Sequence, residues 1–338
     1  MKKQKIRFYA ALLCSSMVFS LVSTPVSAAE TGQLTNPPTS TEELSSPESI
    51  SGNEAASALN GLSVLAANGE AEVTTASELT GALADSSISR ITLKGDIDIG
   101  STLTVNRTVT LDLNGCVLKM TGSDSVIKVE ADGDLTIQDR NTTTQHKFNP
   151  HCKYLTWYID MWELDNGGSE IVSGGVITGG GGDQSNGGGV LVAGGTLVMA
   201  GGSIVGCSAM SRGGGVCNNG TFIMSDGMIK GCTSPDGQYA SGGGVRNSNQ
   251  FTMTGGMIGD PDNENDASHV YNTSSQETTL TISGNAKIYT DITNVGILNA
   301  DGGEIAGTMT NDTNEYGSGT ITLPWNSVPP AALSSRAK

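Results

Sequence analysis

A motif of three glycines followed by a valine recurs along the chain, and this repeat constrains the fold more than any other feature. It begins at Gly187, Gly213 and Gly242, so successive copies start 26 and 29 residues apart. Each copy is followed by a short apolar segment and then by an isoleucine beside glycine: the segments are Leu197-Val198-Met199, Phe222-Ile223-Met224 and Phe251-Thr252-Met253, and the isoleucines are Ile204, Ile229 and Ile258. Short alternating strands at a regular period, separated by turn-forming residues, predict an all-β parallel β-helix in which each repeat forms one coil.

The same order of segments extends beyond these three copies in both directions. The additional segments are Ile127-Lys128-Val129, Leu135-Thr136-Ile137, Val270-Tyr271-Asn272, Leu280-Thr281-Ile282 and Ile297-Leu298-Asn299. Because side chains alternate between the two faces of a strand, we expect one column inside and the next one outside. The inner column is Val190, Val216, Val245 and Val270, and the outer column is Leu191, Cys217, Arg246 and Tyr271. Asn218, Asn247 and Asn272 point inward again, and we expect their amides to hydrogen-bond along the axis.

A short helix is predicted before the first coil. In the segment Ser77–Ala84, Leu79 and Leu83 lie one helical turn apart on the same face. A stack of coils must cover its open end, so this helix is expected to cap the N-terminal end of the stack.

The chain begins with a segment typical of a secretory signal peptide, residues 1–28. Four basic residues precede an apolar run from about Tyr9 to Leu21, and small residues end the segment at Ala28. The apolar run is shorter than the roughly 20 residues that span a bilayer, so we expect cleavage. Residues 29–71, rich in Ser, Thr, Pro and Glu, are expected to form a flexible spacer, and residues 324–338 a C-terminal tail. We therefore predict a secreted protein, or one associated with the cell surface.

The charge balance bears on the partners of such a protein. Without the first 28 residues the chain keeps 14 basic residues against 34 acidic ones. Nucleic acid and anionic membrane surfaces repel a chain of this charge, so neither is an expected partner. No later segment is long and apolar enough to span a membrane.

These residues also resemble a known group of proteins. The stretch Ser77 to Asp139, with Leu111-Asp112-Leu113-Asn114-Gly115 at its centre, resembles the opening of bacterial right-handed parallel β-helix proteins of the pectin-lyase-like superfamily. The glycine repeats resemble those of exported surface proteins of Gram-positive bacteria. The resemblance covers residues 72–323 and implies a right-handed coil and a surface or secreted setting. Many members of the group are adhesins and others cleave polysaccharides, so the fold alone does not choose between them.

One insertion, at about residues 139–170, interrupts the period. Ile177 follows Ile137 by 40 residues, whereas Ile204 follows Met199 by 5. Long loops on a regular scaffold often carry function. Aromatic rings can stack on sugars, so we predict a ligand-binding site for a polysaccharide or a surface glycan, formed by Tyr154, Trp157, Tyr158 and Trp162. The alternative is that these rings fold back and seal the flank of the coils.

Candidate sites for catalysis and metal binding are weaker. Asp112, Asp134 and Asp139 are expected on neighbouring early coils, where two of them would supply a carboxylate pair for a hydrolase. The alternative interpretation is that they are solvated aspartates at strand ends. The acidic run from Asp260 to Asp266 offers oxygen ligands for Ca²⁺, yet it lacks the EF-hand spacing, and an acidic turn is the simpler interpretation. We predict no catalytic residues, no metal site and no cofactor.

Five cysteines follow the predicted signal peptide, and their spacing is not that of a disulfide framework or a zinc site. Cys207 and Cys232 occupy equivalent positions on adjacent coils, where they form either a stacked pair of thiols or one disulfide. The sequence as a whole favours a non-enzymatic β-helix scaffold that is adhesive or glycan-binding. A polysaccharide lyase or a glycoside hydrolase on the same fold is the alternative.

Overall fold

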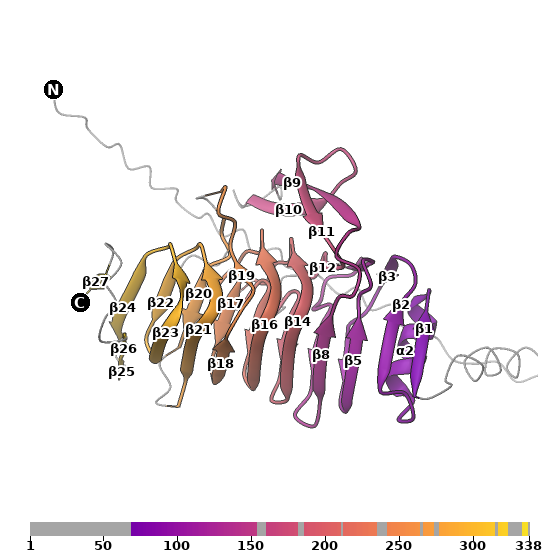
Figure 1. Ribbon diagram of the computed structural model, residues 1–338, viewed down its shortest axis with the longest axis horizontal. Helices are drawn as coiled ribbons and strands as arrows, with labels where there is room; N and C mark the ends of the chain where they lie inside the picture. The colour runs from indigo at the N-terminus through magenta and orange to yellow at the C-terminus, as the bar shows by residue number, and fades with distance from the viewer. Residues whose placement is uncertain are drawn as a thin grey trace, which may run out of the picture. The chain divides into compact units, whose positions relative to one another are not determined.

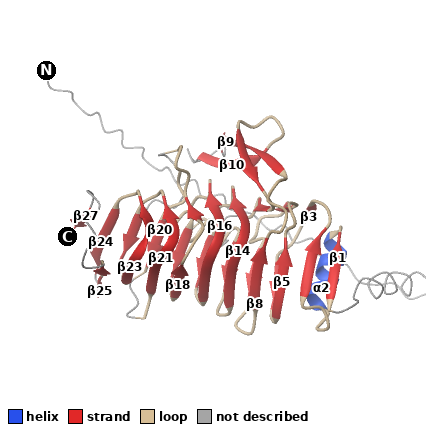
Figure 2. Cartoon of the chain, viewed as in Figure 1, coloured by secondary structure: helices blue, strands red, loops and turns tan. Residues whose placement is uncertain are grey.

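A computed structural model describes residues 69–153, 160–181, 186–210, 212–234, 242–263, 266–273, 277–314, 317–323 and 333–336. The predicted signal peptide and nearly all of the predicted spacer lie outside these residues. The described part of the chain is all-β, with one helix, and most of its strands form two parallel sheets (Figures 1 and 2).

Sheet A contains the longer strands, and its main path follows the order of the sequence. This path consists of β1 (Glu70–Val73), β2 (Arg90–Leu93), β5 (Thr108–Asp112), β8 (Asp134–Gln138), β14 (Thr196–Val205), β16 (Thr221–Lys230), β18 (Gln250–Met253), β21 (Thr279–Ile288), β23 (Ile297–Ile305) and β26 (Thr320–Thr322). Four shorter strands pair beside this path: β3 (Ile97–Ile99), β6 (Val117–Met120), β12 (Val176–Thr178) and β19 (Met257–Ile258). Figure 1 shows the strands of the main path lying side by side in sequence order.

Sheet B contains mostly three-residue strands. They are β4 (Leu103–Val105), β7 (Ile127–Val129), β13 (Val190–Val192), β15 (Val216–Asn218), β17 (Val245–Asn247), β20 (Val270–Asn272), β22 (Ile292–Asn294), β24 (Met309–Asn314), β25 (Gly317–Ser318) and β27 (Leu333–Arg336). The strand β27, which pairs in parallel with β24, lies within the predicted C-terminal tail. From β7 onward the chain alternates between the two sheets, so each period contributes one strand to sheet B and one longer segment to sheet A.

The strand register agrees with the columns predicted from the repeat. Val216 pairs with Val190 on one side and with Val245 on the other, and all three side chains are fully buried. In sheet A, Phe222 pairs with Leu197 and Phe251, and the two phenylalanine rings stack with centroids 4.5 Å apart. The predicted inner columns are therefore confirmed. They meet in one apolar core that runs through the coils.

Glycine permits the close approach of consecutive coils. A Cβ atom on Gly214 would lie 2.6 Å from the carbonyl oxygen of Gly243 on the next coil, and real Cβ atoms essentially never come so close. Gly213, just before it, has a φ of 62°, which is in the left-handed region that favours glycine. The glycine motif thus specifies backbone stacking.

The predicted asparagine ladder is confirmed, and it is longer than expected. Asn218, Asn247, Asn272, Asn294 and Asn311 occupy one register position of sheet B. Each of the first four donates Nδ2 to Oδ1 of the next, at 2.7, 2.8, 2.7 and 2.9 Å. These four side chains are fully buried, so the ladder satisfies polar groups inside the core.

The predicted helix is also confirmed. Helix α2 (Ala76–Ala84) begins with a capping box, in which Thr75 Oγ1 accepts from the Glu78 backbone N–H and the Glu78 carboxylate accepts from the Thr75 backbone N–H. Leu79 is buried against the core. Arg107, which follows β4, binds the C-terminal end of this helix. Its guanidinium donates to the carbonyl oxygens of Ala82 and Leu83 at 2.8 and 3.0 Å.

The insertion forms a small antiparallel sheet of its own. Its strands are β9 (Gln145–Lys153), β10 (Asp160–Leu164) and β11 (Glu170–Ser173). In Figure 1 this sheet projects from the stacked coils beside β12. Phe148 and Trp162 pack beneath it against Val176 and Val205 of the coils, in a second and smaller apolar cluster.

Candidate functional site

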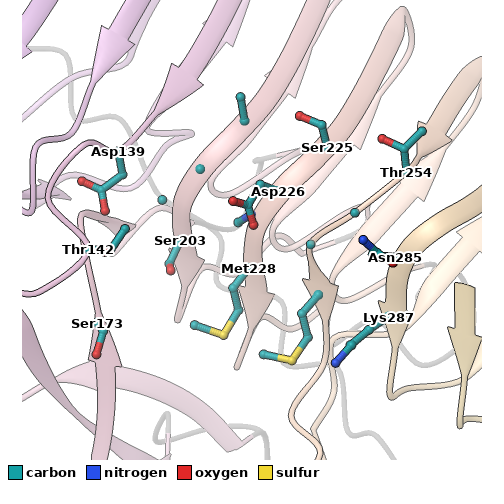
Figure 3. Close-up of a pocket in the computed structure, with 17 residues that line it drawn as sticks. Asp139, Thr142, Ser173, Ser203, Ser225, Asp226, Met228, Thr254, Asn285 and Lys287 are labelled. Atoms are coloured by element: carbon teal, nitrogen blue, oxygen red, sulfur yellow. The ribbon is translucent and has the colours of Figure 1, made fainter.

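An open groove crosses several coils on the outer side of sheet A. Its volume is about 690 Å³. It follows the bends at which the strands of consecutive coils change direction (Figure 3). The lining residues are Asp139, Thr142, Ser173, Ala200, Gly201, Gly202, Ser203, Ser225, Asp226, Gly227, Met228, Thr254, Gly255, Gly256, Met257, Asn285 and Lys287.

One wall of the groove is a column of in-register residues. Ser203, Met228, Met257 and Lys287 pair in sequence across β14, β16, β19 and β21. Neighbouring strands lie about 4.8 Å apart, so this wall repeats at that spacing along the stack. Its two thioethers are half-buried and its lysine is exposed, so the wall combines apolar contact with one positive charge.

The opposite wall is polar. Ser225, Asp226, Thr254 and Asn285 are exposed there, one or two on each successive coil (Figure 3). Hydroxyl and amide groups both donate and accept hydrogen bonds, and an ionised carboxylate accepts them. This combination suits a ligand rich in hydroxyl groups. The described lining contains no aromatic ring.

The floor of the groove requires glycine. Gly227 has a φ of 93°, and a Cβ atom on it would lie 2.6 Å from the carbonyl oxygen of Gly202 on the preceding coil. Any larger residue would push the coils apart and fill the groove. The groove is therefore a consequence of tight stacking at the bends.

Asp139 fixes the end of the groove at the base of the insertion. Its carboxylate accepts backbone N–H bonds from Gly115 and Gly175 at 2.7 Å each, and from Asn141 at 3.3 Å. Asp139 precedes the insertion and Gly175 follows it, so this carboxylate joins both ends of the insertion to the coil beneath. Both of its oxygens are occupied by backbone groups, which gives Asp139 a structural role.

Trp162 lies in the interior. Its side chain is 2% exposed, its ring centroid is 6.4 Å from that of Phe148, and the Lys230 ammonium lies 4.3 Å from the ring centroid. This placement fits the alternative in which the aromatic rings seal the flank. Tyr154, Trp157 and Tyr158 lie outside the described residues, so ligand binding by the insertion stays a prediction.

The expectation of solvated aspartates at strand ends is wrong for Asp112. This side chain is fully buried, forms an ion pair with Arg140 Nε at 3.1 Å, and accepts from Gln138 Nε2 at 2.9 Å and from the Asn114 backbone at 3.1 Å. The turn after β5 folds over the carboxylate, and the sequence alone does not reveal that cover. Asp134 is exposed, as expected.

The acidic run from Asp260 to Asp266 also differs from a simple solvated turn. Asp260 and Asp266 are 6% and 4% exposed, and Asp260 pairs with the buried Lys230 at 3.3 Å. The Lys230 ammonium and a backbone N–H group bind the Asp260 carboxylate, and backbone N–H groups bind that of Asp266, which explains why both side chains are buried. The described residues contain no group of three or more His, Cys, Asp or Glu side chains arranged to hold a metal ion.

The cysteine positions are partly as expected. Cys207 and Cys232 are fully buried free thiols, and burial raises the pKa of Cys232. Cys217, expected outside, is instead 1% exposed, and burial raises the pKa of its thiol too.

Comparison with known proteins finds one similarity, which covers part of the chain. Residues 70–173 match a family model described as "Putative pectate lyase-like adhesive domain". The matched span runs from β1 through β11, so it includes the capping helix, the first coils and the insertion sheet. No curated protein and no solved structure matches the chain. Among the described residues, no helix has the length and apolar character needed to cross a bilayer.

Proposed function

We propose that this protein is an exported, non-enzymatic adhesive scaffold, built as a right-handed parallel β-helix over residues 72–323. The parallel in-register pairing of both sheets supports the β-helix, and the match to a pectate lyase-like adhesive domain supports the adhesive role. In this proposal residues 1–28 direct export, residues 29–71 form a spacer, and the coils act outside the cell or on its surface.

The observation that carries the proposal is the groove over sheet A. It is open, it extends across the coils from Asp139 to Lys287, and it repeats similar groups at the spacing of neighbouring strands. A long ligand with repeated hydroxyl groups, such as a polysaccharide, matches that arrangement. Ser225, Thr254 and Asn285 would bond its hydroxyls, while Met228 would contact its apolar faces.

The insertion extends this proposed binding surface. Thr142 and Ser173, at the two ends of the insertion, line the groove. Tyr154, Trp157 and Tyr158 are proposed to stack on sugar rings, with Trp162 anchoring the insertion from beneath. Each stacked ring contributes roughly 1 kcal/mol, so the three rings together contribute about 3 kcal/mol and by themselves support affinity no tighter than about millimolar. Strong attachment then arises from many copies on one cell.

The test is a polysaccharide array, run together with a screen for new reducing or unsaturated chain ends. Ala200→Arg places a bulky cation in the groove, and its matched control is Ala84→Arg on the exposed side of α2. A second variant, Trp157→Ala with Tyr158→Ala, removes two insertion rings. We expect weakened binding in the groove and insertion variants, native binding in the control, and no product.

The outcomes separate the parts of the proposal. If binding persists in both the groove variant and the insertion variant, the ligand binds elsewhere on the protein. New chain ends from any polymer would show that the protein is an enzyme. Absence of binding to every polymer on the array would refute the glycan ligand.

A further inference from the structure

Two arginines lie close together on the outer side of sheet B. Arg246 is the outward residue of β17, and in the strand register it lies between Cys217 of β15 and Tyr271 of β20. Arg212 directly precedes the glycine motif that leads into β15. Burial lowers the pKa of Arg246, and the positive charge of Arg212 lowers it further, so the two guanidinium groups are near enough to repel each other.

No carboxylate among the described residues pairs with either arginine. The ion pairs of the described residues all involve other cations, although the chain carries 34 acidic residues. The Nε–H group of Arg246 is buried and has no hydrogen-bond acceptor. Burial also lowers the pKa of Arg107, but that guanidinium donates to the carbonyl oxygens of Ala82, Leu83 and Ile88. Arg246 is therefore a half-buried cation whose Nε–H lacks the acceptor that Arg107 has.

A second polar group without a partner lies on the same strand. Ser248 follows Arg246 by two residues, and its backbone N–H bonds the carbonyl oxygen of Asn218, so it continues the strand ladder. Side chains alternate along a strand, which places Ser248 on the same face as Arg246. The Ser248 hydroxyl is buried and has no hydrogen-bond partner. Buried polar groups are nearly always paired, so two unpaired donors on one strand face indicate a missing acceptor.

We propose that Arg246, together with Ser248 and Arg212, binds an oxyanion, namely a carboxylate or sulfate group carried by a ligand. An oxyanion accepts from the buried Nε–H and from the hydroxyl, and its charge offsets the repulsion between the two arginines. A water molecule would supply an acceptor but would leave that repulsion in place. The planar guanidinium suits this role because it presents two parallel N–H groups to the oxygens of an anion. The site lies on sheet B, away from the groove over sheet A, so it is a second binding site.

The neighbouring side chains add no negative charge that would compete with the anion. Burial raises the pKa of the Tyr271 phenol and that of the Cys217 thiol, so both groups keep their protons at neutral pH. The phenol can then donate a further hydrogen bond to the ligand. Asp312 also raises the pKa of Tyr271, but it belongs to β24, three strands beyond β17, and it forms no ion pair with Arg246.

The test is isothermal titration of the folded chain with sodium sulfate and, separately, with sodium acetate, at an ionic strength held constant with chloride. We expect saturable binding of at least one of the two ions. Arg246→Gln keeps an amide of similar length but removes the charge and the pair of parallel donors, so it should weaken binding at least about tenfold. Ser248→Ala removes one neutral donor and should weaken binding by less than Arg246→Gln does.

The matched control is Lys128→Gln, which makes the same change of charge in the same outer column. Lys128 lies three strands from Arg246 and already pairs with Glu130 at 2.7 Å. Three strands span roughly 14 Å, which exceeds the screening length of about 8–10 Å at ordinary salt, so this variant should bind like the native chain. Circular dichroism checks that every variant is folded.

Two polymers distinguish the possible sources of the oxyanion. Chondroitin sulfate carries both carboxylate and sulfate groups, whereas desulfated chondroitin carries carboxylates alone. Binding of both polymers through Arg246 would identify the carboxylate as sufficient, and binding of the sulfated polymer alone would identify the sulfate. The groove variant Ala200→Arg should leave binding of the two small ions unchanged, so this proposal and that of the groove can fail separately.

Three results would overturn the proposal. The first is a native chain that shows no saturable binding of either ion. The second is equal binding by the native chain and by folded Arg246→Gln. The third is a loss of binding in Lys128→Gln as large as that in Arg246→Gln, which would show that the anion responds to the overall charge of the face and has no site at Arg246.

Discussion

The clearest prediction about stability concerns Asn247, the member of the asparagine ladder that makes the most hydrogen bonds. The Asn247 amide donates to Oδ1 of Asn272 at 2.8 Å and to the carbonyl oxygens of Asn249 and Thr279 at 3.1 and 3.0 Å. It accepts from Asn218 Nδ2 at 2.7 Å and from the Asn249 backbone at 3.3 Å. Two amide hydrogens and two accepted bonds amount to about four hydrogen bonds. At roughly 1 kcal/mol each, Asn247→Ala should lower the free energy of unfolding by about 4 kcal/mol.

The matched control is Asn311→Ala at the end of the ladder. Asn311 accepts one bond from Asn294 and donates one to Gly319, and it is only half-buried, so its loss should cost about 1–2 kcal/mol. Urea denaturation followed by circular dichroism gives the total effect. Hydrogen exchange of the β15, β17 and β20 peptides shows whether the loss is local, as expected for coils that contact only their neighbours. Equal costs for the two variants would refute the additive account of the ladder.

Four further predictions concern the coils and their cap. Val216→Asp should lower the free energy of unfolding by at least about 3 kcal/mol, because it buries an unpaired charge. An unchanged melting temperature would show that this column of valines does not lie in the core. Thr75→Ala should cost about 1 kcal/mol through loss of the helix cap, measured by urea denaturation. A thiol reductant should leave the melting temperature unchanged, since Cys207 and Cys232 are free; a large decrease would reveal a disulfide. The folded pKa of Asp266 lies above its ordinary value of 3.8, so its protonated form favours folding, and stability should fall as the pH rises from below 3.8 through the folded pKa. Asp266→Asn should flatten that part of the pH profile, and an identical profile would contradict the assignment.

Periodicity determined most of the coil architecture in advance. Val190, Val216 and Val245 recur at nearly constant spacing with alternating neighbours, and stacking identical positions buries them all at once. The first three members of the asparagine ladder followed from the same columns. Asn294 and Asn311 were missed because the spacing between ladder members shortens there to 22 and 17 residues, although each follows an apolar residue and a threonine.

The candidate sites depended far more on packing between distant segments. Ser203, Met228 and Lys287 occupy outward positions that look unremarkable along the chain, and only the register of β14, β16 and β21 brings them into one wall. The sequence likewise marked the insertion as aromatic but did not separate rings that face solvent from a ring, Trp162, that packs beneath the insertion sheet.

The sequence by itself therefore determined the repeat, the inner columns and the capping helix. These features follow from the local alternation of apolar residues and from a repeat period that is visible in the sequence. Tertiary structure alone decided which acidic side chains are buried and what they face. Asp260 and Asp266 look like parts of a solvated turn in the sequence, but both are buried in the structure. Asp260 pairs with Lys230 of the preceding coil, and the ring of Trp162 lies against that ammonium. The physical reason is that the burial of a carboxyl group, and with it its pKa, depends on neighbours that come from elsewhere in the sequence.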